Sequence, residues 1–301
     1  MSKLTQTKSD SSTTARVYDH PFFKSLIKRS LRYLSAGYPV HYTGPSGIGK
    51  TTLALHVAKL RKRPVTLISG NQDLKNEDLI GAHTGYNRKK LNDNFVKTVR
   101  KIEENVSEDW VEGHLYEAVK YGHTLVYDEF TRSRPDTNNL FLSVIEEKLL
   151  PLYGAKKKNS HIEVHPDFSI IFTSNPTEYV GVFETQDALL DRMITLPFEG
   201  MEEEAEVAVV VERTDIDKAN AEKIVRFIRQ VNERSNNNKA KLSLRSSIII
   251  ADIANKNNYP VDGEDEDFQN LCMDLTYFHM DVSTDEQTDV QEMILEECRK
   301  I

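Results

Sequence analysis

Eight residues from Gly44 to Thr51 have the composition and spacing of a phosphate-binding loop. They read GPSGIGKT, which satisfies the pattern G-x-x-x-x-G-K-[ST], between a short apolar stretch and a helical one. The glycines let successive N–H groups turn inward, and the helix that follows adds its positive N-terminal end. Gly-rich turns also close ordinary strand–helix corners, but the complete pattern favours a nucleoside triphosphate site. We expect nucleotide contacts from Gly44, Pro45, Ser46, Gly47, Ile48, Gly49, Lys50, Thr51 and Thr52.

Within this loop, two side chains have separate predicted roles. Lys50 is expected to meet the β- and γ-phosphates, and Thr51 to hold Mg²⁺. A second pair, Asp128 and Glu129, follows the apolar run Leu125–Tyr127 about 80 residues later. Asp128 is expected to reach Mg²⁺ through its waters, and Glu129 to polarise the attacking water as general base. Because Asp-Glu often follows a strand, this pair alone does not indicate a nucleotide site. We assign these roles because a phosphate loop precedes the pair.

A third polar group ends another strand, in the order Thr173, Ser174, Asn175, Pro176. Polar side chains at the carboxyl ends of parallel strands face the ligand crevice. Asn175 could therefore orient the water or contact the γ-phosphate. Asn before Pro is also common turn chemistry, and this alternative stays open.

The elements that must position these residues alternate between strand and helix. Such an alternation favours a parallel sheet. The predicted strands begin near residues 39, 65, 123, 168 and 193, and the predicted helices of this part cover 22–34, 50–60, 92–105, 110–121, 138–149 and 186–191. Residues 81–90 are expected to form an irregular loop, and LLPLY with HIEV a hairpin around GAKKKNS. Beyond Gly200 only helical patterns follow, at 202–213, 218–232 and 244–255.

The sequence thus predicts an α/β protein with a five-stranded parallel sheet flanked by helices, then a smaller all-helical domain. We expect a mobile tail at 1–16, whose composition is polar, an α/β nucleotide-binding domain at 17–200 and a helical domain at 201–301. The last segment, from Asp262, holds thirteen acidic residues against two basic ones, out of a formal charge of −8 for the chain. It is expected to be a solvated, partly mobile face.

Composition excludes several classes of function. No apolar run approaches the roughly 20 residues that cross a bilayer, and the polar opening lacks the apolar core of a signal peptide, so a cytoplasmic protein without a membrane partner is expected. A nucleic-acid partner is not favoured, because no uniformly basic surface is indicated. The two cysteines, Cys272 and Cys298, are typical of reduced thiols, although a disulfide between them stays open.

Taken together, the phosphate loop, the DE and TSNP strand ends, LLDRMITLPF and the helical segment resemble an AAA+ ATPase module. The hairpin before the TSNP strand is similar to that of the MoxR branch. The strings DEFTRSRP and TQDALLDRMIT resemble the gas-vesicle group of that branch, which belongs with ATPases that remodel rubisco or activate nitric-oxide reductase. The resemblance covers residues 18–254.

This resemblance implies a Mg²⁺-dependent ATPase that works as a hexameric ring, with a helical lid. Arg192 matches the arginine finger that reaches a neighbouring subunit's nucleotide, and Arg245 matches the sensor arginine that contacts the γ-phosphate of its own chain. Either could instead be a surface arginine at a helix end. Arg132 and Arg134 form either a second subunit-facing cationic site or simple caps and ion pairs.

The expected function is that of a chaperone or remodeller in gas vesicle assembly, with shell or accessory proteins as clients. The basic segments 83–90 and 156–158 are candidate client-contacting surfaces or plain solvated loops. Two alternatives remain: a MoxR-type activator of a metalloenzyme, and an ATP-binding minor structural component of the gas vesicle with little turnover.

Overall fold

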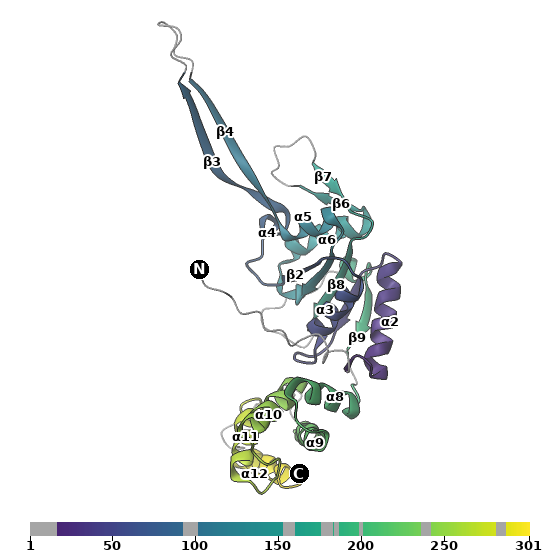
Figure 1. Cartoon of the computed structure of the whole chain (residues 1–301), viewed down its shortest axis with the longest axis vertical. Coiled ribbons are helices and arrows are strands. Elements are labelled where there is room, and N and C mark those ends of the chain that lie inside the picture. Colours follow the sequence, from purple (N-terminus) through teal and green to yellow (C-terminus); the bar gives the residue numbers. More distant parts are fainter. Residues whose placement is uncertain are drawn as a thin grey trace. The chain divides into compact units, whose positions relative to one another are not determined.

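The computed structural model divides into two compact units (Figure 1). The structure describes residues 17–92, 102–152, 160–175, 183, 187–198, 201–235, 242–280 and 287–301. The α/β unit comprises Ser30–Thr43 and Thr51–Leu196. The helical unit comprises Pro197–Ile301, Gly44–Lys50 and the described part of Met1–Arg29. The domains predicted in chain order, 17–200 and 201–301, stay a prediction, because this division follows contacts and not chain order.

A parallel sheet forms the centre of the α/β unit. In the described residues its five strands have the order β2-β5-β8-β1-β9, and the pairs β2 with β5, β5 with β8 and β8 with β1 are parallel. The central strands β5 and β8 are almost wholly buried, as expected of a parallel sheet covered by helices. The strands are β1 (Val40–Thr43), β2 (Val65–Ser69), β5 (Thr124–Asp128), β8 (Ser169–Ser174) and β9 (Ile194–Pro197). All five lie where the sequence predicted strands.

Helices flank this sheet, and aromatic rings fill the core around β5 and β8. The ring centroids of Tyr127 and Phe141 are 4.9 Å apart, and those of Phe130 and Phe172 are 5.2 Å apart. Burial of such rings is a large source of stability, and it fixes the ends of the strands that carry polar residues. The helices are α2 (Pro21–Ser35), α3 (Lys50–Leu60), α4 (Asn76–Ile80), α5 (His114–Tyr121), the 3₁₀ turn η1 (Phe130–Arg132), α6 (Pro135–Glu146) and α7 (Asp187–Leu190).

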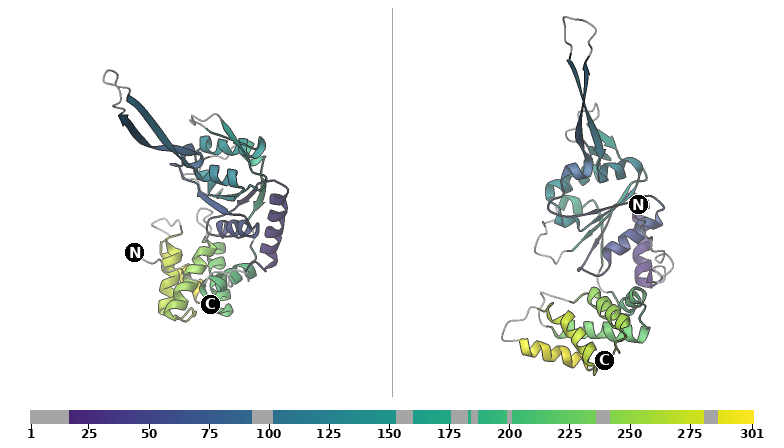
Figure 2. Two further views of the ribbon diagram at one scale, coloured as in Figure 1. Left: turned by 45° about the horizontal axis from the view of Figure 1, so that its top comes forward. Right: turned by 60° about the vertical axis from the view of Figure 1, so that its left-hand side comes forward.

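A long two-stranded ribbon lies where the sequence predicted a loop and helices. Strand β3 (Gly81–Asn92) pairs antiparallel with β4 (Ile102–Glu112), and the ribbon extends from the α/β unit (Figures 1 and 2). The predicted helix at 92–105 is therefore wrong in its described part, the irregular loop at 81–90 is a strand, and the helix predicted from Trp110 begins only at His114. Apolar positions four residues apart share one side of a helix and of a strand alike, so periodicity could not separate the two.

The short predicted hairpin is confirmed. Strand β6 (Leu149–Pro151) pairs antiparallel with β7 (His161–Glu163), just before β8. The basic segment 156–158, between these strands, lies outside the described residues.

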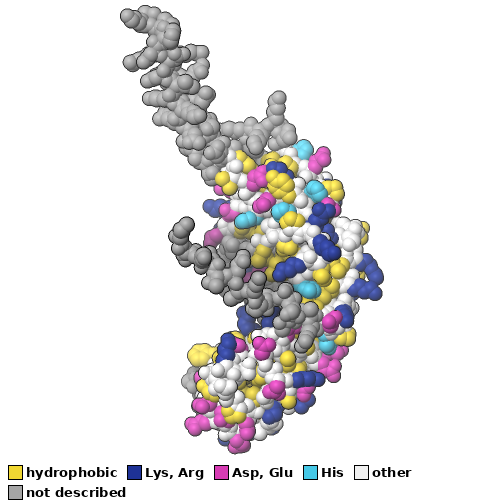
Figure 3. Space-filling model, viewed as in Figure 1, with side chains coloured by type: hydrophobic (Ala, Val, Ile, Leu, Met, Phe, Trp, Pro, Cys, Tyr) yellow, Lys and Arg dark blue, Asp and Glu magenta, His cyan; other side chains and the backbone are white. Residues whose placement is uncertain are grey.

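The helical unit holds a core of its own, built from α8 (Glu203–Thr214), α9 (Lys218–Arg234), α10 (Leu244–Asn257), α11 (Glu266–Tyr277) and α12 (Gln287–Cys298). The first three confirm the helices predicted beyond Gly200. The acidic C-terminal segment was expected to be a solvated, partly mobile face, and its described part differs in having a buried side. Phe268 and Ile294 are fully buried, while Asp and Glu side chains lie on the face of the helical unit that is seen in Figure 3. Helices α11 and α12 are amphipathic, and the charge on their outer faces made the whole segment look solvated by composition.

Both cysteines belong to this core. Cys272 and Cys298 are free and fully buried. The hydrogen bond with the Cys298 thiol, together with burial, raises the pKa of Cys272.

In the described parts of the chain, every helix is too short or too polar to pass through a lipid bilayer.

Candidate active site

The phosphate loop leads from β1 into α3, and its lysine is held within it. Lys50 is buried, and its ammonium group donates hydrogen bonds to the carbonyl oxygens of Gly44 at 2.8 Å and Pro45 at 2.6 Å. Gly47 and Gly49 have φ angles of 77° and 94°, the left-handed region that glycine adopts without strain. Thr52 lies in the first turn of α3. The ammonium group that is expected to meet the phosphates is thus held by two carbonyl oxygens of its own loop.

The start of α10 lies against this loop, within the same unit. A Cβ atom added to Gly47 would lie 2.6 Å from Oγ of Ser243 and 3.3 Å from Cβ of Arg245. Ser243 is the N-cap of α10, and its Oγ accepts a hydrogen bond from the Arg245 backbone N–H. Arg245 is exposed. The structure thus brings together the loop and the predicted sensor arginine. Ser243 was not predicted, although a serine before an apolar helix is a cap signal.

Asp128, at the carboxyl end of β5, accepts hydrogen bonds from two hydroxyl groups. Its Oδ1 accepts hydrogen bonds of 2.5 Å from Oγ1 of Thr51 and of Thr173. Carboxylate and hydroxyl oxygens are the hard donors that Mg²⁺ prefers, so this group fits the metal that was expected at Thr51 and Asp128. Thr173 was missed as a site residue, because its relevance depends on β8 lying beside β5.

Glu129 has a conformation that only a few non-glycine residues adopt. Its φ is 50°, in the left-handed region, and its backbone N–H donates to Oγ1 of Thr173 at 2.9 Å. The end of β2 packs closely on it, since a Cβ on Gly70 would lie 2.2 Å from the Glu129 carbonyl oxygen. Surrounding structure must fix such a conformation, and it is often found at functional sites.

The Glu129 side chain meets an arginine. Its Oε2 lies 2.7 Å from Nε of Arg132, and both side chains are partly exposed. The ion-pair alternative for Arg132 therefore has a contact to support it. Arg134, by contrast, is the exposed residue before α6, and its side chain makes no capping hydrogen bond there.

Asn175 is buried directly after β8, whose neighbours in the sheet are β5 and β1. The strands around it are tied by His41, whose Nε2 lies 2.8 Å from Oγ of Ser174 and whose Nδ1 lies 3.0 Å from Oγ1 of Thr195. These contacts join β1, β8 and β9 next to the predicted residue. The role of Asn175 stays a prediction.

Arg192 makes its contacts away from this group. Its guanidinium binds the Glu146 carboxylate and the Ala188 carbonyl oxygen. Among the described residues, no hydrogen bond or ion pair joins it to Asp128, Glu129 or Asn175. This separation from the site of its own chain is expected of a residue that completes the site of a neighbouring chain.

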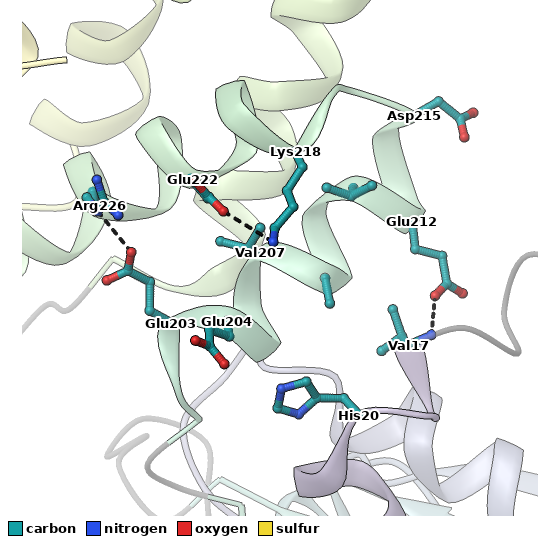
Figure 4. Close-up of a pocket in the computed structure, with 12 residues that line it drawn as sticks. Val17, His20, Glu203, Glu204, Val207, Glu212, Asp215, Lys218, Glu222 and Arg226 are labelled. Atoms are coloured by element: carbon teal, nitrogen blue, oxygen red, sulfur yellow. Dashed lines mark hydrogen bonds and ion pairs between the residues drawn. The ribbon is translucent and has the colours of Figure 1, made fainter.

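A groove in the helical unit is a poor phosphate site. It has a volume of about 840 Å³, and Figure 4 shows acidic side chains around it, with ion pairs from Lys218 to Glu222 and from Arg226 to Glu203. Excess negative charge disfavours a nucleotide. Its lining is Val17, His20, Glu203, Glu204, Val207, Ala208, Val211, Glu212, Asp215, Lys218, Glu222 and Arg226.

Comparison with known proteins defines the class first. The family model of the AAA domain, dynein-related subfamily, matches residues 39–193. The fold is also similar to that of a RuvB mutant from Thermotoga maritima, with a TM-score of 0.50 and 16% identity over 92% of this chain and 71% of that one. The parallel sheet, the phosphate loop and the helical unit are those of an AAA+ ATPase.

Two relatives define the family within that class. The gas vesicle ATPase GvpN of Ancylobacter aquaticus is 43% identical over 251 residues, which cover 83% of this chain and 70% of the relative. That of Haloferax mediterranei is 44% identical over 225 residues, 74% of this chain and 64% of the relative. The chain belongs to the gas vesicle ATPase GvpN family of MoxR-type AAA+ proteins, which confirms the predicted family and makes it an ATP hydrolase. Members of the AAA+ class bind nucleotides and generally form oligomeric rings.

Proposed function

We propose that this ATPase hydrolyses ATP to ADP and phosphate with Mg²⁺ and uses the cycle as a chaperone or remodeller in gas vesicle assembly. The observation that carries the chemistry is the pair of hydroxyls converging on Oδ1 of Asp128, next to the partly exposed carboxylate of Glu129. The names of its relatives support the gas vesicle as its place of action. We accordingly propose a cytoplasmic protein associated with gas vesicles.

The residues of the loop would bind and orient the nucleotide. The N–H groups of Gly44–Lys50 and the Lys50 ammonium would hold the phosphates, and the buried position of Lys50 would make its charge more effective than in water. Thr51 and Asp128 would hold Mg²⁺, which offsets negative charge on the phosphate oxygens when bound. Arg245, at the capped start of α10 beside Gly47, would contact the γ-phosphate.

Hydrolysis needs a base that takes a proton from water. Glu129 has a carboxylate that is partly exposed, on a backbone held by Thr173, and would serve as this base. Asn175, at the end of the neighbouring strand, would orient the water. Arg192 would reach the nucleotide of the next subunit in a hexameric ring, because its contacts lie apart from its own Asp128 and Glu129.

We also propose that the β3–β4 ribbon contacts the client protein. It extends from the α/β unit, so that both long edges of the two-stranded pair lack a further strand in the described residues (Figure 1). Open edges of this kind are suited to pairing with another chain.

The proposal is tested by steady-state phosphate release, with and without gas vesicle shell protein. Acceleration by shell protein, lost when the ribbon is shortened by symmetric deletion, is the expected result. A rate that shell protein leaves unchanged would favour the activator of a metalloenzyme, which a pull-down would identify by its captured client. Nucleotide binding with almost no phosphate release under any condition would favour the structural component.

A further inference from the structure

Arg192 is held by its own chain in a fixed geometry. Its Nε donates to Oε2 of Glu146 at 2.8 Å, and its Nη2 lies 2.6 Å from the same oxygen. Its Nη1 donates to the carbonyl oxygen of Ala188 at 2.6 Å. A guanidinium has five N–H donors in one plane, so among the described residues these contacts leave one donor on each terminal nitrogen. Two such donors form the fork that binds phosphate oxygens.

The backbone that carries this fork is equally well fixed. Arg192 follows α7, and its N–H donates to the carbonyl oxygen of Leu189 at 3.2 Å. Leu189 and Met193 are buried in the core of the α/β unit, together with Phe141 of α6. Glu146 is the last residue of α6, so the helix that packs on this core also presents the carboxylate. Backbone and side chain of Arg192 are therefore both restrained by α6 and α7.

We propose that Glu146 is a positioning residue that holds Arg192 ready for the nucleotide of the partner subunit. A long arginine side chain loses rotamer freedom when it binds, and a side chain already restrained loses less. The inference rests on the proposed function, in which Arg192 acts on a neighbouring chain. It adds that the finger depends on a second residue, which the sequence pattern gave no reason to select.

The pair contributes little to the stability of the fold. The Glu146 side chain is 59% exposed and that of Arg192 is 32% exposed, and ion pairs with this exposure are weak in water. A Glu146→Ala chain is therefore expected to fold as the parent does, with an unchanged Tm. Any loss of activity would then come from the orientation of Arg192.

The first experiment compares single variants in ATPase assays of the full chain. Glu146→Ala is expected to lower kcat on the order of 10²-fold, as a small misplacement of a reacting group does, with little change in KM for ATP. Glu146→Gln keeps an acceptor oxygen and should retain more activity. Glu147→Gln, at the adjacent exposed position, is the control and should match the parent. Parental kcat in Glu146→Ala would overturn the proposal.

The second experiment asks in which subunit Glu146 acts. Glu146→Ala is mixed with Glu129→Gln, a chain that keeps Arg192 and Glu146 but lacks the proposed base. Each intact site of a Glu146→Ala subunit can then receive the finger of a Glu129→Gln neighbour, so activity per Glu146→Ala subunit should rise. No rise would show that Glu146 affects the nucleotide site of its own chain rather than that of the neighbour, and would overturn the proposal.

A parallel mixture tests the trans role of Arg192 separately from the positioning role of Glu146. Arg192→Ala mixed with Glu129→Gln should also gain activity if Arg192 acts across subunits. A gain there, without one for Glu146→Ala, overturns only the positioning role. No gain in either mixture shows that the trans role of Arg192 is itself wrong, and the role of Glu146 falls with it.

Discussion

Oγ1 of Thr173 donates a 2.5 Å hydrogen bond to Oδ1 of Asp128 and accepts one of 2.9 Å from the Glu129 backbone N–H. One buried hydroxyl on β8 therefore fixes both acidic residues at the end of β5. Thr173 and Thr51 donate to the same carboxylate oxygen, so the positions of the proposed metal-binding carboxylate and of the proposed base both depend on Thr173.

Thr173→Val tests this dependence with a side chain of nearly the same shape. Loss of the hydroxyl leaves the Glu129 N–H without its acceptor and costs about 1–3 kcal/mol of unfolding free energy. We expect kcat to fall roughly ten- to hundred-fold, as the same free energy lost in the transition state implies. Phosphate release and denaturant unfolding measure the two effects. Thr66→Val, which removes a 2.9 Å contact with Nδ1 of His123, should lower stability alone. Equal activity losses in both variants would contradict the role of Thr173.

The sequence was sufficient for the residues that act through local pattern. The phosphate loop, the five strands and the first three helices of the helical unit were predicted because each depends on nearby residues. Thr173 was missed because its role arises from strand order, which places β8 beside β5. Strand order depends on contacts between distant segments, and no spacing along the chain encodes it.

The ribbon and the C-terminal helices were missed for different reasons. Strands β3 and β4 are stabilised mainly by each other, so neither has a burial pattern that distinguishes it from a helix. Helices α11 and α12 carry so much acidic charge that composition predicted a mostly solvated face, although Phe268, Cys272, Ile294 and Cys298 bury one side. Mean composition cannot show how charge is distributed around a helix.

Lys50 and Glu129 should affect different steps of the ATPase cycle. Lys50→Ala removes the cation that the loop encloses, so nucleotide binding should be abolished. Glu129→Gln keeps the loop and removes the base, so ATP should bind with near-parental affinity and turnover should stop. A fluorescent-nucleotide titration and phosphate release separate the two. Parental hydrolysis by Glu129→Gln would mean that another group acts as base.

Gly47 should be more sensitive to substitution than its backbone angle alone explains. Gly47 and Gly37 have φ angles of 77° and 84°, so alanine at either position costs about 1–2 kcal/mol in strain. A Cβ at Gly37 meets no atom within 4 Å, whereas one at Gly47 meets the capping Oγ of Ser243. We expect Gly47→Ala to weaken nucleotide binding roughly tenfold, since displacement of the cap costs about 1 kcal/mol or more.

Gly37→Ala is the matched control, and it should lower stability with nucleotide affinity unchanged. Adding Ser243→Gly to Gly47→Ala removes the close contact and should recover part of the affinity, which a double-mutant cycle would measure. Equal affinities for Gly47→Ala and Gly37→Ala would show that the start of α10 does not influence the loop.

Glu297 should make the stability of the helical unit depend on pH. It is 2% exposed on α12, and one of its oxygens lies 2.6 Å from both Nη1 of Arg234 and Nζ of Lys300. Burial alone would raise the pKa of Glu297, but the hydrogen bonds from Lys300 and Arg234 outweigh it and lower the pKa below its ordinary value of 4.5. A carboxyl with a lowered pKa stabilises the fold above its unfolded pKa, and this contribution is lost as the pH falls through the folded one.

Glu297→Gln should therefore lower the free energy of unfolding at pH 7 by more than the loss of a single exposed ion pair, because it removes the charge that both Arg234 and Lys300 contact. The matched control is Glu296→Gln, since Glu296 meets the same Arg234 nitrogen at 2.9 Å but is 51% exposed, and its loss should cost less than about 1 kcal/mol. Denaturant unfolding is measured from pH 7 down to about pH 3. The parent should have the larger free energy of unfolding at pH 7, and its difference from Glu297→Gln should disappear below the ordinary carboxyl pKa of 4.5. An advantage that stays constant over this range would mean that the charge of Glu297 does not hold α12 to α9.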